Sequence, residues 1–432
     1  MASTKSLAAK QPKSSSKKHY AVWPRPSPRR DVEAMLKCRT VEESRIEFRS
    51  SRFRIFILGA GFSHPAGLPL AADLWKDVLR RASGLSGRAS FFRDDLNNYI
   101  EFRKRSEGVA LKPNEVDFEE FMAFLDIEHY LGLRGKDTWS EHGNEGQVVV
   151  KTLIGEILTE LTPAKDRIPE LYLRFAKLFQ PTDYVLTFNY DVLLERALEV
   201  AGTPFRLYPS RFQRISGDRA TIDATRQELV VLKLHGSVDW FDRTFYSELD
   251  DEFRKQGSSD HPTNPVFNPD SPLKIVPLTD GPRFESDPLR QMYRALDVEK
   301  LYRGRILFCA TPSLLNPSSM KIVYPHMLRD FWDGLGQAGV LNFGMVIIGF
   351  SLPQQDDYAK QVIYRLVRNY QENYWGQSEF EHKKTPLLLI DRRASAKTRR
   401  EFIERYRFVD WNRAEVQFDG FDDKALSLIE AT

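Results

Sequence analysis

Residues 53–61 read FRIFILGAG, a run of β-branched and aromatic residues that ends in a glycine turn. Such a run predicts a strand buried on both faces, and the glycines permit a tight connection to the next element. That element is expected to be a helix, because apolar residues recur at four-residue spacing over residues 70–82 before Ser83-Gly84 ends the pattern.

Later apolar runs continue the alternation of strand and helix. The expected strands are Asp183 to Phe188, Leu229 to Leu234, Arg305 to Ala310, Met345 to Phe350 and Pro386 to Ile390. Apolar runs that do not alternate with polar residues suit strands covered on both faces, and intervening helices suit parallel pairing. The sequence therefore predicts an α/β fold, a Rossmann-like doubly wound parallel sheet with a helical insertion.

The composition suggests how the chain is divided. Residues 1–50 are expected to be a basic, largely disordered tail and lead-in, and 51–83 the first part of the Rossmann-like core. Residues 84–180 show helical periodicity and are interpreted as the insertion. Residues 181–432 are expected to complete the core, with an irregular Pro-, Asp- and Ser-rich segment at 240–300.

Composition and charge exclude several classes of protein. The chain has 432 residues and 41% hydrophobic content, without an apolar run long enough to cross a membrane. Its two cysteines, Cys38 and Cys309, cannot form a disulfide framework or a four-cysteine zinc site. This favours a reducing, cytoplasmic location and predicts no metal.

The basic charge is concentrated at the start of the chain. Residues 1–30 contain eight Lys and Arg, whereas the rest has 55 against 60 Asp and Glu. Nucleic-acid binding would therefore be indirect or depend on the tail alone, and a solvated leader or a partner-docking arm explains the tail as well.

The glycine turn is the first candidate site. Gly59 and Gly61 follow a strand, where backbone amides can approach a pyrophosphate. The strict dinucleotide fingerprint needs a third glycine at position 64, which is His64 here. By itself the pattern fits a tight structural turn and a phosphate cradle equally.

Two further strand ends deliver polar residues. Asn189 and Asp191 lie in TFNYD, where Asn189 stands outside the following helix and Asp191 suits a helix cap. His235 lies in LHGSVDW, and histidine is the natural acid or base near neutral pH, although a lone histidine is often structural.

The last two strand ends carry small and acidic residues. Gly349 and Ser351 lie in IGFSLPQQDD, which suits a ribose or phosphate contact, or a turn in which Asp356 or Asp357 starts a helix. Asp391 follows another strand, where it suits an adenosine ribose or a surface turn.

Together the four ordered motifs GAGFS with GLP, TFNYD, LHGSVDW and IGFSLPQQD resemble the sirtuin family, specifically its divergent prokaryotic sirtuin-like branch. The resemblance implies that NAD is bound as a substrate. Asn189 and Asp191 then match the family's nicotinamide-ribose motif, and His235 matches its catalytic histidine. Asn189 and His235 are the expected catalytic residues. The implied NAD-binding residues are Gly59, Ala60, Gly61, Ser63, Pro69, Asp191, Gly349, Ser351 and Asp357, and Asp391 is added from its position at a strand end.

The same resemblance implies a function. Enzymes of this branch are NAD hydrolases of bacterial anti-phage defence, giving nicotinamide and ADP-ribose. Cleavage passes through an oxocarbenium-like state, so Asn189 is expected to position ribose and water while His235 accepts a proton. The alternatives are a non-catalytic NAD or ADP-ribose binding module and an NAD-dependent protein deacylase, for which the zinc cysteines are missing. A homo-oligomer and a partner such as a HerA-type translocase ATPase are also expected.

Overall fold

The computed structural model describes residues 53–133, 143–208, 211–223, 225–302, 310–315, 318, 326–329, 331–376 and 383–432. The tail expected over residues 1–50 lies outside these ranges, as does the strand expected at 305–310 except for Ala310.

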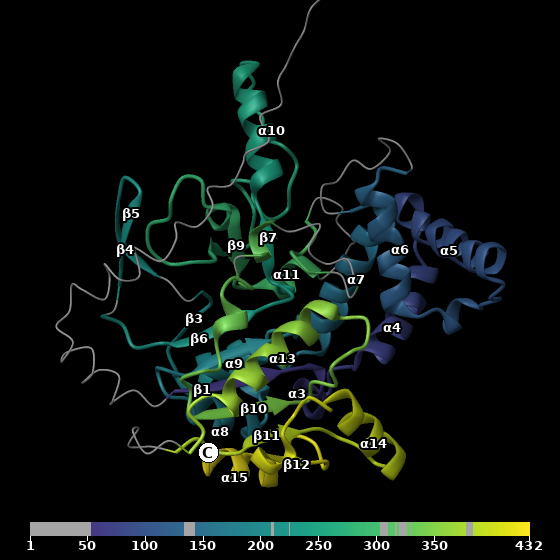
Figure 1. Ribbon diagram of the computed structural model, residues 1–432. Helices are drawn as coiled ribbons and strands as arrows, with labels where there is room; N and C mark the ends of the chain where they lie inside the picture. The colour runs from purple at the N-terminus through teal and green to yellow at the C-terminus, as the bar shows by residue number, and fades with distance from the viewer. Residues whose placement is uncertain are drawn as a thin grey trace, which may run out of the picture. The chain divides into compact units, whose positions relative to one another are not determined.

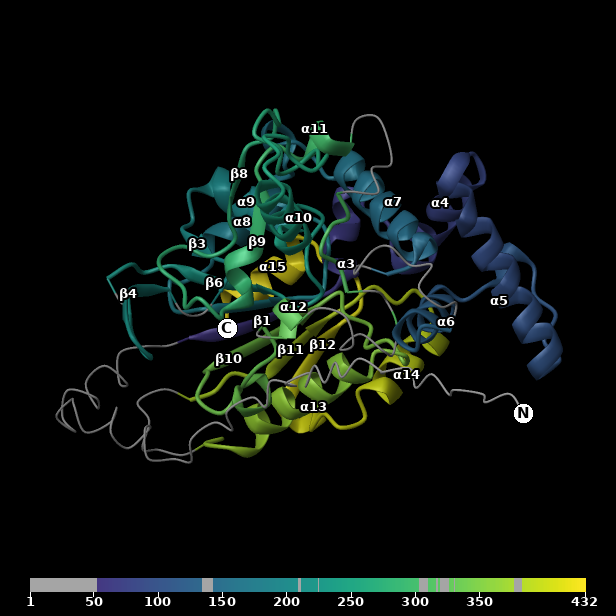
Figure 2. The same ribbon diagram turned by 90° about the horizontal axis from the view of Figure 1, so that it is seen from above.

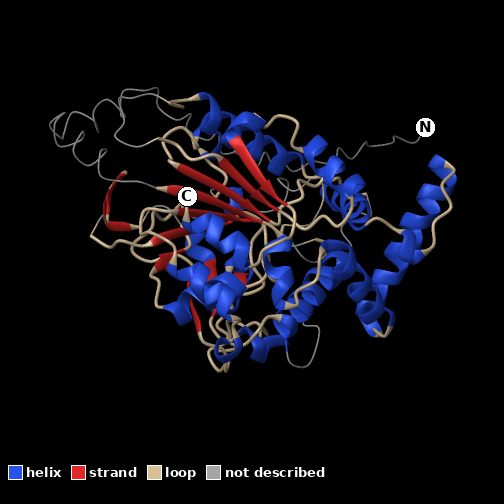
Figure 3. Cartoon of the chain, turned by 90° about the horizontal axis from the view of Figure 1, so that it is seen from below, coloured by secondary structure: helices blue, strands red, loops and turns tan. Residues whose placement is uncertain are grey.

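The main sheet has seven parallel strands in the order β12-β11-β10-β1-β2-β6-β3. Their bounds are β1 (Arg54–Leu58), β2 (Tyr184–Thr187), β3 (Phe205–Arg206), β6 (Leu229–Lys233), β10 (Gly344–Ile348), β11 (Leu387–Ile390) and β12 (Ala414–Gln417). Every residue of β6, β10 and β11 is buried, which explains why their sequences are apolar without alternation. The predicted doubly wound fold is confirmed, and Figure 3 shows the strands side by side in one sheet.

The strand order reverses beside β1. Phe56 of β1 faces Val185 of β2 on one side and Val346 of β10 on the other. The chain builds the sheet outward through β2 and β6, then returns to add β10, β11 and β12 on the opposite side. In open parallel sheets, ligands bind beyond the carboxyl ends of the strands at such a reversal.

Helices cover both faces of this sheet. On one face lie α8 (Glu170–Lys177), α9 (Leu193–Ala201) and α15 (Asp423–Glu430), and on the other α13 (Asp357–Glu372) and α14 (Ala396–Arg405), as Figure 2 shows. Aromatic side chains fill the first interface: the ring of Phe56 lies 5.9 Å from that of Phe175 on α8. The sheet therefore lies between two layers of helices.

The segment predicted as a helical insertion is helical. It ends with α8, which covers the sheet. Before α8 it contains α5 (Phe91–Glu107), α6 (Phe118–Tyr130) and α7 (Glu145–Leu161), which follow α4 (Ala71–Ser83) in the chain. In Figure 1 these helices gather to one side of the sheet. Trp75 of α4 stacks on Phe118 of α6 at 4.7 Å, and the side chain of Asn144 caps α7 through the N–H of Gln147.

Residues 240–300 are more ordered than their composition predicts. They contain α10 (Thr244–Lys255), α11 (Val298–Tyr302) and an antiparallel sheet of β7 (Trp240–Asp242), β9 (Met292–Ala295) and β8 (Ile275–Pro277). These strands are three or four residues long, too short to show a period in the sequence. They share a small core of their own around Phe241, Tyr246 and Phe267.

The remaining short elements are α3 (Ala60–Ser63), α12 (His326–Arg329) and the hairpin of β4 (Phe212–Ser216) and β5 (Arg219–Ile222). Within the described ranges, no helix has both the length and the apolar character needed to cross a membrane.

Candidate active site

The turn after β1 is packed directly against the turn after β10. Gly59 N–H donates to Ile348 O and Gly61 N–H to Gly349 O, each at 2.9 Å. A Cβ on Gly349, whose φ is 61°, would lie 2.2 Å from the backbone nitrogen of Phe62. Only glycine fits this approach, and the amides of Gly59 and Gly61 are already used within the protein. Ala60 is the exposed residue of the turn.

Asn189, at the end of β2, holds the glycine turn in place. Its Nδ2 donates to Gly59 O at 3.0 Å and to the buried hydroxyl of Ser63 at 3.1 Å, and its own N–H donates to Thr187 Oγ1. Both amide hydrogens of the side chain are therefore engaged, which leaves Oδ1 as the atom that can address a ligand.

His235, just beyond β6, is buried against an aspartate that sequence reasoning did not select. Its Nε2 lies 3.2 Å from Asp356 Oδ2, and only 9% of its side chain is exposed. Asp356 also caps α13, because its Oδ1 accepts the N–H of Ala359 at 3.0 Å. One carboxylate thus joins the start of α13 to the histidine.

Aromatic rings surround the histidine. Phe188 lies edge-on to the His235 ring at 5.0 Å, and Trp332 lies nearly parallel to it at 6.2 Å. Tyr190 lies 6.0 Å away, and burial raises the pKa of its phenol well above the usual value. The histidine therefore occupies a mostly apolar enclosure in which a charge pair is weakly screened.

Asp191 has the local role that its sequence context also allows. Its Oδ1 accepts the N–H of Leu193 at 3.0 Å at the start of α9. Its carbonyl accepts a hydrogen bond from Lys233, which forms a buried ion pair with Glu195 at 2.8 Å. Burial raises the pKa of Glu195, and the Lys233 ammonium opposes that shift. These contacts fix the backbone that carries Asn189.

The end of β10 is braced by α14. Phe350 O accepts from Tyr406 Oη at 2.7 Å, and Ser351 O accepts from Arg405 Nη1 at 3.2 Å. The next residue, Leu352, is buried with a φ of 52°, a left-handed conformation that a leucine adopts only when its surroundings impose it. The segment after Gly349 is therefore held in one shape.

The outer candidates differ in their surroundings. Asp391, at the end of β11, is buried; burial raises its pKa, and Arg393, 3.1 Å from Oδ1, opposes the shift. The Asp357 side chain is 71% exposed and pairs with Lys360 one helical turn along α13. Pro69 is partly buried just before α4.

The fold brings together the carboxyl ends of β1, β2, β6 and β10. The hydrogen bonds of Asn189 and Gly61 tie three of these ends into one cluster, and His235 with Asp356 ties β6 to the start of α13. Asp357 faces solvent outside the cluster, and Asp356 occupies the inner position. The arrangement offers an amide oxygen and an imidazole at the reversal of strand order, the place where this fold binds ligands.

Comparison with known proteins finds one domain similarity, in the region that carries the candidate site. A family model described as a SIR2-like domain matches residues 183–296, which include Asn189, Asp191 and His235. This part of the chain is therefore similar to a SIR2-like domain. No curated protein matches the chain.

Solved structures of Sir2 proteins align over most of the chain at low similarity. One is Sir2Tm bound to a propionylated peptide, with 13% identity, coverage of 91% of this chain and 98% of that one, and a TM-score of 0.31. Another is Sir2 in complex with the inhibitor EX-527, 2'-O-acetyl-ADP-ribose and a deacetylated p53 peptide, with 12% identity, 90% and 98% coverage and a TM-score of 0.32. At these TM-scores the alignments add nothing to the domain match.

Proposed function

We propose that this protein binds NAD beyond the carboxyl ends of β1, β2, β6 and β10 and hydrolyses its nicotinamide–ribose bond. The observation that carries the proposal is the joint placement of Asn189 and His235. Both lie at the reversal of strand order, and both are held by buried hydrogen-bonding partners. The match of this region to a SIR2-like domain supports the choice of NAD.

The polar groups of the cluster suggest how NAD would lie. The amides of Gly59 and Gly61 bond the protein itself, so the pyrophosphate would approach the exposed Ala60 and the hydroxyl of Ser63. The nicotinamide ribose would lie between Asn189 Oδ1 and the His235 ring. Asp391 and Ser351 would lie toward the adenosine end, as proposed from their positions at neighbouring strand ends.

In the proposed reaction, water attacks the anomeric carbon of the ribose. The electron pair of the broken carbon–nitrogen bond goes to nicotinamide, which leaves as a neutral molecule and requires no protonation. The proton lost by the water, or by a ribose hydroxyl that assists it, passes to the His235–Asp356 pair and then to solvent. Asn189 Oδ1 would orient the ribose hydroxyls or the water.

Asp356 gives the histidine a defined partner in this step. A carboxylate 3.2 Å from Nε2 stabilises the imidazolium that forms when the ring takes up a proton. The surrounding aromatic rings lower the local polarity and strengthen that interaction. Asp356 is therefore proposed as a positioning residue for His235.

The enclosure of the histidine favours water as the acceptor. Only 9% of the His235 side chain is exposed, and Phe188, Tyr190 and Trp332 surround its ring. A small nucleophile reaches such a site more readily than an acyl-lysine side chain. The biological output implied by the sequence resemblance is then depletion of cellular NAD during phage infection, under control of a partner or of oligomerisation.

The experiment that tests the proposal incubates the full chain with NAD, with and without an acetyl-lysine peptide, and separates the products by chromatography. Nicotinamide and ADP-ribose without peptide would support hydrolysis. Nicotinamide release that requires the peptide and yields O-acetyl-ADP-ribose would show a deacylase instead. Saturable NAD binding without any product would show a binding module.

A further inference from the structure

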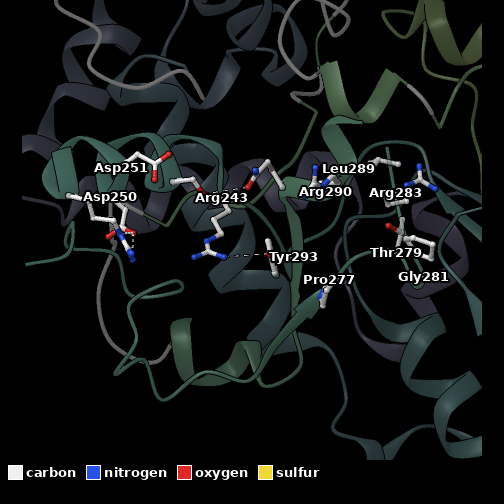
Figure 4. Close-up of a pocket in the computed structure, with 14 residues that line it drawn as sticks. Arg243, Asp250, Asp251, Pro277, Thr279, Gly281, Arg283, Leu289, Arg290 and Tyr293 are labelled. Atoms are coloured by element: carbon white, nitrogen blue, oxygen red, sulfur yellow. Dashed lines mark hydrogen bonds and ion pairs between the residues drawn. The ribbon is translucent and has the colours of Figure 1, made fainter. Parts of the chain in front are cut away.

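A cavity lies in the segment between β7 and β9, away from the strand ends that form the candidate active site. It has a volume of about 640 Å³ and is formed by one face of α10 together with residues 277–283 and 289–293. It shares no lining residue with the proposed NAD site. Figure 4 shows its lining, in which arginines predominate over acids.

Arg243, which precedes α10, is the central cation of this cavity. Its guanidinium lies over the rings of Tyr246 at 5.6 Å and Tyr293 at 5.7 Å. Its Nε is buried without a hydrogen-bond partner, and within the described part of the chain no carboxylate pairs with it. Aromatic contacts fix the plane of the guanidinium. Its Nη1 donates a long hydrogen bond to Tyr293 Oη at 3.5 Å, which leaves Nη2 as the N–H group that can address a ligand.

The other arginines of the cavity divide into paired and unpaired groups. Arg254 is neutralised by Asp250 at 2.9 Å and Arg283 by Asp287 at 2.7 Å. Arg290 is exposed and, like Arg243, has no carboxylate partner among the residues that the structure describes. In Figure 4 the carboxylates of α10 and Arg290 lie on opposite sides of Arg243, so the positive end of the cavity runs from Arg243 toward Arg290.

Hydroxyl groups complete the lining. Ser247, one helical turn beyond Arg243, has its Oγ 3.5 Å from Gln291 Oε1, and Thr279 lines the facing segment. Two unpaired guanidinium groups with nearby hydroxyl donors match the several oxygens of a phosphate better than a single carboxylate. A volume of about 640 Å³ suits a molecule of nucleotide size.

We propose that this cavity binds a small molecule that carries a phosphate or pyrophosphate group, with Arg243 and Arg290 as its principal ligands. The site is separate from NAD hydrolysis and does not depend on it. Binding is expected to weaken as salt increases, because Arg290 is exposed to solvent.

Calorimetric titration of the full chain with inorganic pyrophosphate tests the proposal. Arg243→Gln should weaken binding by at least about tenfold, because a charge-assisted hydrogen bond is lost, and Arg290→Gln should weaken it several-fold. Arg400→Gln, a change at an exposed arginine on α14, is the matched control and should bind as the wild type does. Succinate, titrated in parallel, distinguishes a phosphate site from a general anion site.

Arg290→Gln keeps the test decisive even if Arg243→Gln fails to fold, because the Arg290 side chain is exposed and pairs with no carboxylate among the described residues. Weaker pyrophosphate binding by the variants and little binding of succinate would support the proposal. Three results would overturn it: no binding of pyrophosphate to the wild type, tighter binding of succinate, or unchanged affinity in Arg290→Gln and in any folded Arg243→Gln. Unchanged affinity in the variants is also the outcome expected if pyrophosphate binds only at the glycine turn after β1.

Discussion

Asp356 and Asp357 are neighbours in the sequence but face different surroundings. Asp356 is 2% exposed and contacts His235, whereas Asp357 pairs with Lys360 on the outer face of α13. A helix start turns successive side chains in different directions, so the sequence QQDD alone does not reveal which carboxylate points inward. The sequence resemblance selected Asp357, whereas in the structure Asp356 is the residue that contacts His235.

We predict that Asp356→Asn lowers kcat for NAD hydrolysis by at least about tenfold and changes KM little, because the charge that supports a protonated His235 is removed. Asparagine also caps helices, so the start of α13 should persist. Steady-state nicotinamide release measures the effect, and Asp357→Asn is the control expected to behave as wild type. Equal activity in both variants would rule out the positioning role.

Lys384 gives a pH dependence to stability. Burial lowers its pKa from 10.5 to about 8, although its ammonium donates to Val340 O and Tyr370 O. Between pH 8 and 10.5 the unfolded chain holds this proton and the folded chain does not, so the free energy of unfolding should rise with pH. The full effect is on the order of 3 kcal/mol.

Urea unfolding of Lys384→Met from pH 7.5 to 10.5 should show a shallower rise than the wild type. Lys397→Met, at a side chain 82% exposed, should keep the wild-type slope. A parallel dependence in all three proteins would show that Lys384 does not titrate in this range.

At the scale of elements, the strands that the sequence predicted are those that are long and buried. Each of these strands, β1, β2, β6, β10 and β11, has four or five residues, most of them apolar. Because they are buried on both faces, each appears in the sequence as an unbroken apolar run. β12 was missed because AEVQ mixes polar and apolar residues at the sheet edge, and β3 because it has two residues. Tertiary pairing, which no local pattern shows, makes these segments strands.

The sequence predicted the positions of the two candidate catalytic residues but not the residues that they contact. Asn189 and His235 follow strong strand signals, so their place at the sheet edge follows from the sequence. Their partners do not, because Asn189 bonds the turn at Gly59, 130 residues away in sequence, and His235 contacts Asp356, which is similarly remote from it in the chain. The Arg243 cavity depends equally on the pairing of β7 with β9.

The contact between the turns after β1 and β10 is also a stability feature. Gly349→Ala should destabilise the protein by more than about 3 kcal/mol, since its Cβ would lie 2.2 Å from Phe62 N in a left-handed conformation. Gly202→Ala has a comparable φ of 72° but open space around the new Cβ, and should cost about 1 kcal/mol. Denaturant unfolding measures the loss of stability in each variant. Equal losses in the two variants would show that the turns after β1 and β10 are not in tight contact.

At the scale of the whole molecule, the proposed site is assembled from distant parts of the chain. The SIR2-like match at residues 183–296 contains Asn189 and His235 but neither the glycine turn nor Asp356. The seven-stranded sheet brings all four together by placing β1 between β2 and β10. A fragment limited to the matched residues would lack the partners of both candidate catalytic side chains and is not expected to act on NAD.

In the proposed reaction, this assembled site transfers the ADP-ribosyl group of NAD to water with the help of His235. The most direct measurement incubates wild-type and His235→Ala protein with NAD in ¹⁸O-labelled water and analyses the products by mass spectrometry. We predict nicotinamide and ADP-ribose carrying one ¹⁸O from the wild type, and neither product above background from the folded variant. Equal product from both proteins would show that His235 is not needed, and ADP-ribose without the label would show that water is not the acceptor.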